Sequence, residues 1–144
     1  SAVHHFDIFS TIASAAGIKS SYENALDGVN LLPYINNEKT NQPHQTLFWR
    51  SGNHQSVLHG KWKYIISKKE NLRWLFDTSV DPVEQNNIIE NHPEEVRLIE
   101  ELLAQFNSKQ KDPLFPSTYE APILIDKFDG QQYEEGDEYI YWSN

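Results

Sequence analysis

The chain opens with apolar residues repeated at helical spacing. Within residues 4–16 the apolar positions are Phe6, Phe9, Ile12, Ala13 and Ala16. This spacing predicts an amphipathic helix. Gly17 follows directly, where a left-handed residue commonly ends a helix. We therefore expect one helix with a single apolar face.

Four short aromatic and β-branched runs follow a polar stretch at 36–43, which predicts a loop between two parts of the chain. Gly or Asn separates the runs, which cover 46–50, 55–59, 63–67 and 73–76. Gly60-Lys61 predicts a tight two-residue turn, because Gly supplies a positive φ at its first position. The pattern predicts an antiparallel meander.

A second helical pattern begins at Pro93, which suits the first turn of a helix. Its apolar stripe is formed by Val96, Ile99, Leu102, Leu103 and Phe106. We expect this helix to cover the sheet and to end near Lys109. The predicted class is α+β, with a four-stranded antiparallel sheet packed by a C-terminal helix, and with the N-terminal helix added.

Prolines interrupt the remainder, residues 112–144, which we expect to form an extended tail. Within it, 123–125 and 139–142 are aliphatic or aromatic enough to form strands or wrapping contacts, and 134–138 predicts a solvated turn.

Composition limits the partners of the chain. Its 144 residues are 38% hydrophobic, which suffices for one core. Twelve Lys and Arg against 21 Asp and Glu give a net charge of −9, which disfavours nucleic acid and anionic membranes as partners. No apolar run approaches the ~20 residues that span a bilayer. We therefore expect no nucleic-acid partner and no membrane span.

The strand region carries a series of motifs in a characteristic order. They are LFW at 47–49, GKWKY at 60–64, LFD at 75–77, DPVE at 81–84 and NI at 87–88. In this order and spacing they resemble the C-terminal subdomain of sulfatases, enzymes of the alkaline-phosphatase-like superfamily.

The resemblance begins nearer the N-terminus. Val3, His5, Asp7 and Thr11 match the sulfatase segment that leads into the last helix of the catalytic domain, with Ser10 in place of a Pro. The stretch DGVNLLP at 27–33 resembles the family's Asp-Gly-Xaa-Ser-Leu-Xaa-Pro. The resemblance therefore implies three parts: 1–36 as the residual end of the catalytic domain, 44–111 as the C-terminal subdomain, and 112–144 as the tail.

Sulfatases use a formylglycine nucleophile, made from a Cys or Ser in a Cys/Ser-Xaa-Pro-Xaa-Arg motif, beside a calcium ion. This chain has no Cys and no such motif. We expect a fragment that lacks the catalytic N-terminal domain, is inactive alone, contains no cofactor and shapes the substrate cleft. The resemblance implies that the intact enzyme, with calcium and formylglycine, hydrolyses aryl or carbohydrate sulfate esters. A periplasmic or secreted location is compatible with it.

Candidate substrate-binding residues lie between the first two strands: Arg50, Asn53 and His54. In sulfatases this loop can face the active-site cleft. A guanidinium pairs with oxyanions, and amide and imidazole groups give directional hydrogen bonds to a sulfate or a sugar hydroxyl. The alternative is an ordinary polar hairpin. We identify no catalytic residue.

Other polar groups favour structural roles. The histidines at 4, 5, 44 and 59 lack the spacing of a known metal motif, and the carboxylates are dispersed, so we expect no metal site. Asp77, Asp81 and Glu84 are better explained as acceptors for local backbone N–H groups.

Several partner hypotheses stay open. The apolar face of the N-terminal helix would pack on the catalytic domain; otherwise it could form a homodimer or dock on the chain's own sheet. An alternative function is a free-standing carbohydrate-binding or scaffold module that uses its tryptophans as a platform. A truncated gene product without function is a third hypothesis.

Overall fold

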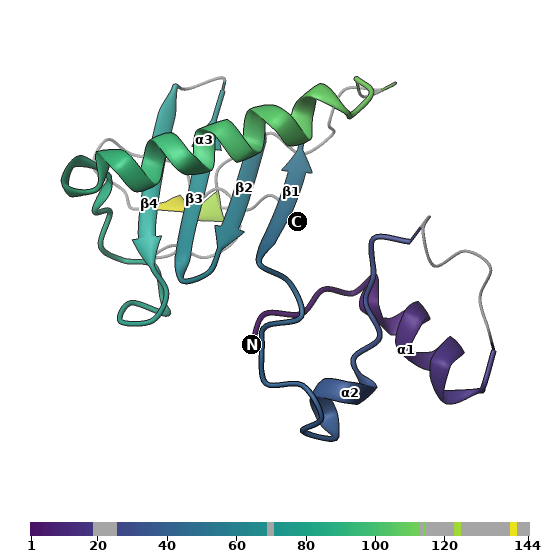
Figure 1. Ribbon diagram of the computed structural model, residues 1–144. Coiled ribbons are helices and arrows are strands. Elements are labelled where there is room, and N and C mark those ends of the chain that lie inside the picture. The colour runs from purple at the N-terminus through teal and green to yellow at the C-terminus, as the bar shows by residue number, and fades with distance from the viewer. Residues whose placement is uncertain (19–25, 69–70, 113, 115–122, 125–138, 141–144) are drawn as a thin grey trace. The chain divides into compact units, whose positions relative to one another are not determined.

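A computed structural model describes residues 1–18, 26–68, 71–112, 114, 123–124 and 139–140 (Figure 1). The chain forms two compact units, Ser1–Leu47 and Phe48–Asn144. The predicted α+β class is confirmed, because the structure contains a four-stranded antiparallel sheet, a long helix after it and a helix near the N-terminus.

The first unit contains α1 (Asp7–Ala15) and the short α2 (Leu32–Ile35). Gly17 has a φ of 71°, so the predicted left-handed residue after α1 is confirmed. Phe9 and Ile12 are 61% and 63% exposed. The apolar face of α1 is therefore largely uncovered. No sequence pattern indicates α2, because its four residues are too few for a helical periodicity to show.

The second unit is built on the predicted meander. The strands of the meander are β1 (Thr46–Ser51), which begins at the end of the first unit, β2 (His54–His59), β3 (Trp62–Ser67) and β4 (Leu72–Asp77), in the order β1-β2-β3-β4. β2 and β3 pair antiparallel with His59 opposite Trp62, and β3 and β4 pair with Ser67 opposite Leu72. Gly60 has a φ of 59°, which confirms the tight turn predicted there.

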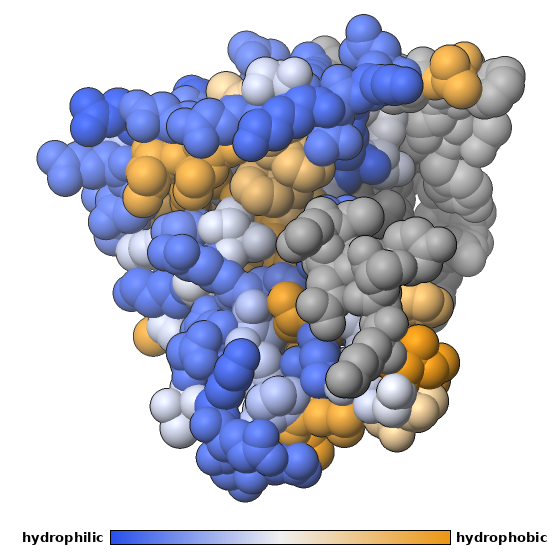
Figure 2. Space-filling view, turned by 45° about the vertical axis from the view of Figure 1, so that its right-hand side comes forward, coloured by the Kyte–Doolittle hydropathy of each residue, from blue (hydrophilic) through white to orange (hydrophobic). Residues whose placement is uncertain are grey.

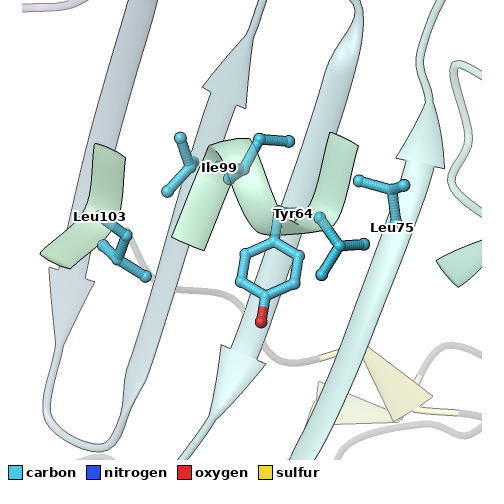
Figure 3. Close-up of a cluster of buried hydrophobic side chains, with 6 residues drawn as sticks. Tyr64, Leu75, Ile99 and Leu103 are labelled. Atoms are coloured by element: carbon cyan, nitrogen blue, oxygen red, sulfur yellow. The ribbon is translucent and has the colours of Figure 1, made fainter. Parts of the chain in front are cut away.

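The long helix α3 (Pro93–Ser108) lies across one face of this sheet and follows the 3-10 turn η1 (Ile89–Asn91) (Figure 1). The buried core between helix and sheet consists of Val57, Tyr64, Leu75, Val96, Ile99 and Leu103 (Figure 3). Hydrophilic side chains cover the outer side of the helix, and hydrophobic ones show beneath it (Figure 2). The predicted apolar stripe therefore faces the sheet.

The other face of the sheet is also buried. Leu47, Ile65 and Phe76 are at most 4% exposed, and they alternate along their strands with residues that face α3. His54, Ser56 and Ser67 are the buried polar residues of this second face. Burial on both faces explains why apolar and aromatic residues occupy adjacent positions at 47–49, 64–66 and 74–76.

Two further strands lie in the tail. β5 (Ile123–Leu124) pairs antiparallel with β6 (Tyr139–Ile140), so the strand alternative is confirmed for these residues. The predicted turn at 134–138, Trp142 and most of the predicted extended tail lie outside the described residues. No helix in the described part of the chain has the length and apolar character needed to cross a membrane.

Candidate functional site

The β1–β2 hairpin carries the three predicted substrate-binding residues. Arg50 lies in β1, Asn53 in the two-residue turn, and His54 is the first residue of β2. Gly52 supplies the positive φ of 55° at the first turn position. The carbonyl oxygen of Asn53 accepts a hydrogen bond from the Lys68 N–H at 2.9 Å, which ties this hairpin to the next connection.

Strand alternation separates Arg50 from His54. The Phe48 ring stacks on Phe106 of α3 at 4.4 Å, so Arg50, two residues later, lies on the helix-covered face of the sheet. Gln55 and Asn107 of α3 exchange side-chain hydrogen bonds of 3.1 and 3.0 Å, so His54 lies on the opposite face. The structure therefore does not bring Arg50 and His54 together around one ligand.

These residues also differ in access. The His54 residue is 5% exposed, whereas the Arg50 side chain is 24% exposed. Arg50 Nη2 lies 3.7 Å from the exposed carboxylate of Asp112, a pair that solvent screens. Arg50 is therefore better placed than His54 to meet a ligand, and the roles of all three residues stay predictions.

The acidic turn after β4 has a structural role, in which Asp77 and Asp81 accept local backbone N–H groups as predicted, whereas Glu84 binds a lysine side chain. Asp81 Oδ2 accepts the Asn86 N–H at 2.8 Å, and this bond, with others in the turn, lowers the Asp81 pKa despite its partial burial. Asp77 pairs with Lys61 Nζ at 2.6 Å, which lowers the Asp77 pKa. Glu84 adopts a φ of 58° and pairs with Lys63 Nζ at 2.7 Å. These carboxylates hold the turn against the sheet.

Asn87 completes the edge of the sheet. Its side-chain oxygen accepts the Leu75 N–H at 3.0 Å, and its side-chain nitrogen donates to the Arg73 carbonyl at 3.2 Å. The Ile88 N–H donates to the Leu75 carbonyl at 2.9 Å. Asn87 and Ile88 therefore occupy backbone groups on the outer edge of β4, which gives the NI motif a structural explanation.

Asp7 organises the first unit. Its carboxylate accepts the N–H groups of His4 and Val29 at 2.8 and 2.9 Å, and His44 Nε2 lies 2.8 Å from Oδ1. Burial of Asp7 by itself raises its pKa, but the two N–H groups and His44 outweigh burial and lower it. Asp7 thereby connects the start of α1 to two distant segments.

The other residues of the N-terminal motif reinforce this connection. The Thr11 hydroxyl donates to the Asp7 carbonyl at 2.7 Å and accepts the Leu31 N–H at 3.0 Å. Ser10, which replaces the family's Pro, donates to the Gly28 carbonyl at 2.8 Å. A Cβ on Gly28 would lie 2.2 Å from the Phe6 carbonyl oxygen, so the motif requires glycine here.

The described residues do not fit the calcium site that the resemblance implies. Calcium takes about 6–8 oxygen ligands, yet Asp7, Asp77 and Asp81 are committed to backbone and cationic partners. No group of three or more His, Cys, Asp or Glu that could hold a metal occurs among the residues with described structure.

The tryptophans of the described sheet are at most partly exposed. The three in the described sheet, at 49, 62 and 74, are each partly buried. Lys61 Nζ lies 4.4 Å from the Trp62 ring centroid, and the His92 ring packs against the same indole at 4.7 Å. This geometry gives the carbohydrate-platform alternative no specific support.

Sequence reasoning missed a polar network on the helix-covered side. The Tyr64 hydroxyl donates to Glu100 Oε1 at 2.7 Å, and Arg73 Nη1 donates to the same oxygen at 3.1 Å. Burial and the bond to Glu100 raise the Tyr64 pKa. In the sequence, Glu100 directly follows Ile99, a member of the apolar stripe. This position alone does not indicate which residues Glu100 contacts.

Solved structures provide the comparison with known proteins, since no protein-family model and no curated protein matches the chain. A Bacteroides thetaiotaomicron protein labelled "6S-sulf", described with the metabolism of multiple glycosaminoglycans, is 26% identical with a TM-score of 0.56. That match covers 72% of this chain and 24% of the other.

Two further structures share the fold. A 2-O GAG sulfatase is 24% identical with a TM-score of 0.54, over 71% of this chain and 23% of the other. A protein of Bacteroides thetaiotaomicron described as a candidate sulfatase is 21% identical with a TM-score of 0.62, over 80% of this chain and 30% of the other. The chain thus spans less than a third of their length. The ordered motifs and the shared fold together confirm the resemblance of this chain to the sulfatase family.

Proposed function

We propose that this chain is part of a sulfatase that hydrolyses the sulfate esters of a carbohydrate. The observation that carries the proposal is the placement of the sulfatase-like motifs on β1, the β2–β3 turn, β4 and the acidic turn, in order, on a fold that sulfatase structures share. The 26% identity over 72% of the chain supports it.

The chain contributes to the wall of the substrate cleft. The β1–β2 hairpin presents Arg50 near its end with the side chain partly exposed, and a guanidinium pairs with sulfate oxygens in a planar, two-pronged geometry. Asn53 in the turn can add a donor and an acceptor for sugar hydroxyls. His54, which is 5% exposed, is a third predicted contact with less access to substrate than Arg50.

The chemical step belongs to other residues of the intact enzyme. The resemblance implies a formylglycine nucleophile and calcium. These 144 residues contain no precursor motif for formylglycine. The described carboxylates do not form a group that could hold calcium. The 144-residue chain by itself is therefore inactive.

The substrate class is a sulfated glycan. The 6S-sulf protein, at 26% identity, is described with glycosaminoglycan metabolism, which favours a carbohydrate sulfate over a simple aryl sulfate. Carbohydrate substrates also suit the combination of a cation and an amide at the hairpin, because they present both sulfate and hydroxyl groups.

The test compares the 144-residue chain with the polypeptide encoded by the whole reading frame that contains it. Sulfate release from sulfated disaccharides and from an aryl sulfate is measured with calcium and with a chelator. We expect calcium-dependent release from a disaccharide by the longer polypeptide and no release by the 144-residue chain. Turnover by the short chain, or none by a longer polypeptide that carries the precursor motif, would contradict the proposal.

Arg50→Ala in the active polypeptide tests the cleft assignment. We expect KM for the sulfated disaccharide to rise about tenfold, because a charge-assisted hydrogen bond is lost. Lys109→Ala, which removes the same charge at the exposed end of α3, is the matched control and should leave KM unchanged. Equal effects of the two substitutions would show that only net charge matters.

A further inference from the structure

An open pocket of about 430 Å³ lies at the β4 end of the sheet, away from the β1–β2 hairpin. β4, η1 and α3 each contribute to its walls. Its volume falls within the roughly 300–1,000 Å³ typical of small-molecule sites. None of its lining residues belongs to the proposed substrate-binding set.

Two arginines from different elements reach this pocket. Arg73 comes from β4, and its side chain is 51% exposed although it donates to Glu100. Arg97 comes from α3, is exposed, and makes no ion pair with any residue of the described chain. A guanidinium with unused donors is a suitable partner for a sulfate or carboxylate group.

Two carboxylates balance these cations. Glu90 and Glu100 line the same pocket, so its lining has no formal net charge. The Tyr64 hydroxyl and Arg73 fix the orientation of Glu100 through one of its oxygens. Carboxylate oxygens accept hydrogen bonds from hydroxyl groups. A ligand with several hydroxyl groups and a single negative charge matches this set. A dense polyanion would be repelled by both carboxylates and by the chain's net charge of −9.

The remaining lining is apolar. Leu72, Ile89 and Val96 come from three different elements, and Val96 is also part of the buried core. Apolar side chains can pack against the C–H groups of a sugar ring while polar groups at the rim fix its orientation.

We propose that this pocket binds one sugar residue that carries a single sulfate or carboxylate group. Arg97 contacts the anionic group, and Glu90 and Glu100 accept hydrogen bonds from the ring hydroxyls. The site is distinct from the hairpin and does not depend on the proposed function, because binding needs neither a nucleophile nor a metal.

The experiment is an NMR titration of the complete 144-residue chain with a hexose 6-sulfate at constant ionic strength. We expect saturable shifts of the Asn71, Ile89 and Arg97 amides. The same hexose without sulfate, and sodium sulfate alone, should each bind at least about tenfold more weakly, since each retains only part of the interactions.

Arg97→Ala should weaken binding of the hexose 6-sulfate about tenfold, because the anion loses a charge-assisted partner. Lys109→Ala, at the other end of α3, is the matched control and should leave the affinity unchanged. Absence of shifts in the pocket, unchanged affinity in Arg97→Ala, or equal binding of sodium sulfate would overturn the proposal; the last result would indicate a site for a free oxyanion only. None of these outcomes depends on sulfatase activity.

Discussion

At the scale of single residues, Asp7 shows how one buried side chain fixes a segment that contains little regular structure. The carboxylate is fully buried, and its hydrogen bonds reach residues 22 and 37 positions away in the chain. Replacement by an amide would keep one acceptor oxygen and place an N–H₂ group against existing donors. The charge and geometry of Asp7 are therefore both required.

We expect Asp7→Asn to destabilise the first unit by about 1–3 kcal/mol at neutral pH, the usual effect of leaving a buried donor unsatisfied. The folded-state pKa of Asp7 is lowered, so its contribution is present above the unfolded pKa of about 3.9 and is lost as the pH falls through the folded value. The difference between wild type and variant should therefore shrink in acid.

Hydrogen exchange of the Val29 amide, followed as a function of pH, measures this effect locally. Asp112→Asn makes the same chemical change at an exposed carboxylate and should alter stability by less than about 0.5 kcal/mol. A variant difference that persists undiminished at low pH would show that the charge of Asp7 is not responsible.

Gly28 and Gly60 are required for different reasons, and alanine substitutions distinguish them. Gly28→Ala places a Cβ 2.2 Å from a backbone oxygen, so we expect a loss above about 3 kcal/mol or failure of the first unit to fold. Gly60→Ala meets open space but keeps a positive φ, so we expect a loss of about 1–2 kcal/mol. Urea unfolding of both variants checks the order, and equal losses would contradict it.

At the scale of secondary-structure elements, the outer edge of β4 is the informative feature. An unpaired strand edge offers N–H and C=O groups to other chains. Here an asparagine side chain and one backbone N–H occupy several of these groups. The acidic turn positions Asn87, because Asp81 accepts the Asn86 N–H and Glu84 pairs with Lys63 of β3.

We expect Asn87→Ala to cost about 1–2 kcal/mol and to accelerate hydrogen exchange of the Leu75 amide, since that N–H loses its acceptor. Asn87→Asp keeps the acceptor and loses the donor to Arg73, so its effect should be smaller at Leu75. Gln85→Ala, at an exposed position in the same turn, is the control and should leave the Leu75 amide protected. Unchanged exchange in Asn87→Ala would show that this side chain does not protect the edge.

At the scale of the whole molecule, the informative feature is that α1 exposes apolar side chains to solvent. Ile8, Phe9 and Ile12 are each more than half exposed. Under the proposed function, the catalytic part of the intact enzyme covers this face. A second copy of the chain is the alternative occupant.

Ile12→Glu distinguishes these occupants. In the 144-residue chain the side chain is already 63% exposed, so we expect a stability change below about 0.5 kcal/mol. In the polypeptide of the whole reading frame we expect a lower unfolding temperature and lower sulfatase activity, because a charge would be buried. Ala15→Glu, at an exposed position of the same helix, is the control. Sedimentation analysis of the short chain completes the test, since loss of a dimer in Ile12→Glu would favour self-association.

Local patterns allowed much of the second unit to be predicted. Strand alternation, the Gly60 turn and the apolar stripe from Val96 to Phe106 depend on near neighbours in the chain, so their periodicity is visible in the sequence. The candidate site was less predictable. Arg50, Asn53 and His54 are close in sequence, but alternation places Arg50 and His54 on opposite faces, and burial leaves little of His54 accessible.

The sequence by itself determined the meander, the covering helix and the order of the sulfatase-like motifs, because each depends on short-range spacing. Only the tertiary structure decided which polar groups meet. Asp7 contacts His44, Asn87 binds the edge of β4, and Tyr64 and Arg73 both donate to Glu100. These partners are far apart in the sequence, so no local periodicity indicates them. Such contacts form because folding buries polar groups that must then find partners, and the chain path determines which partners are within reach.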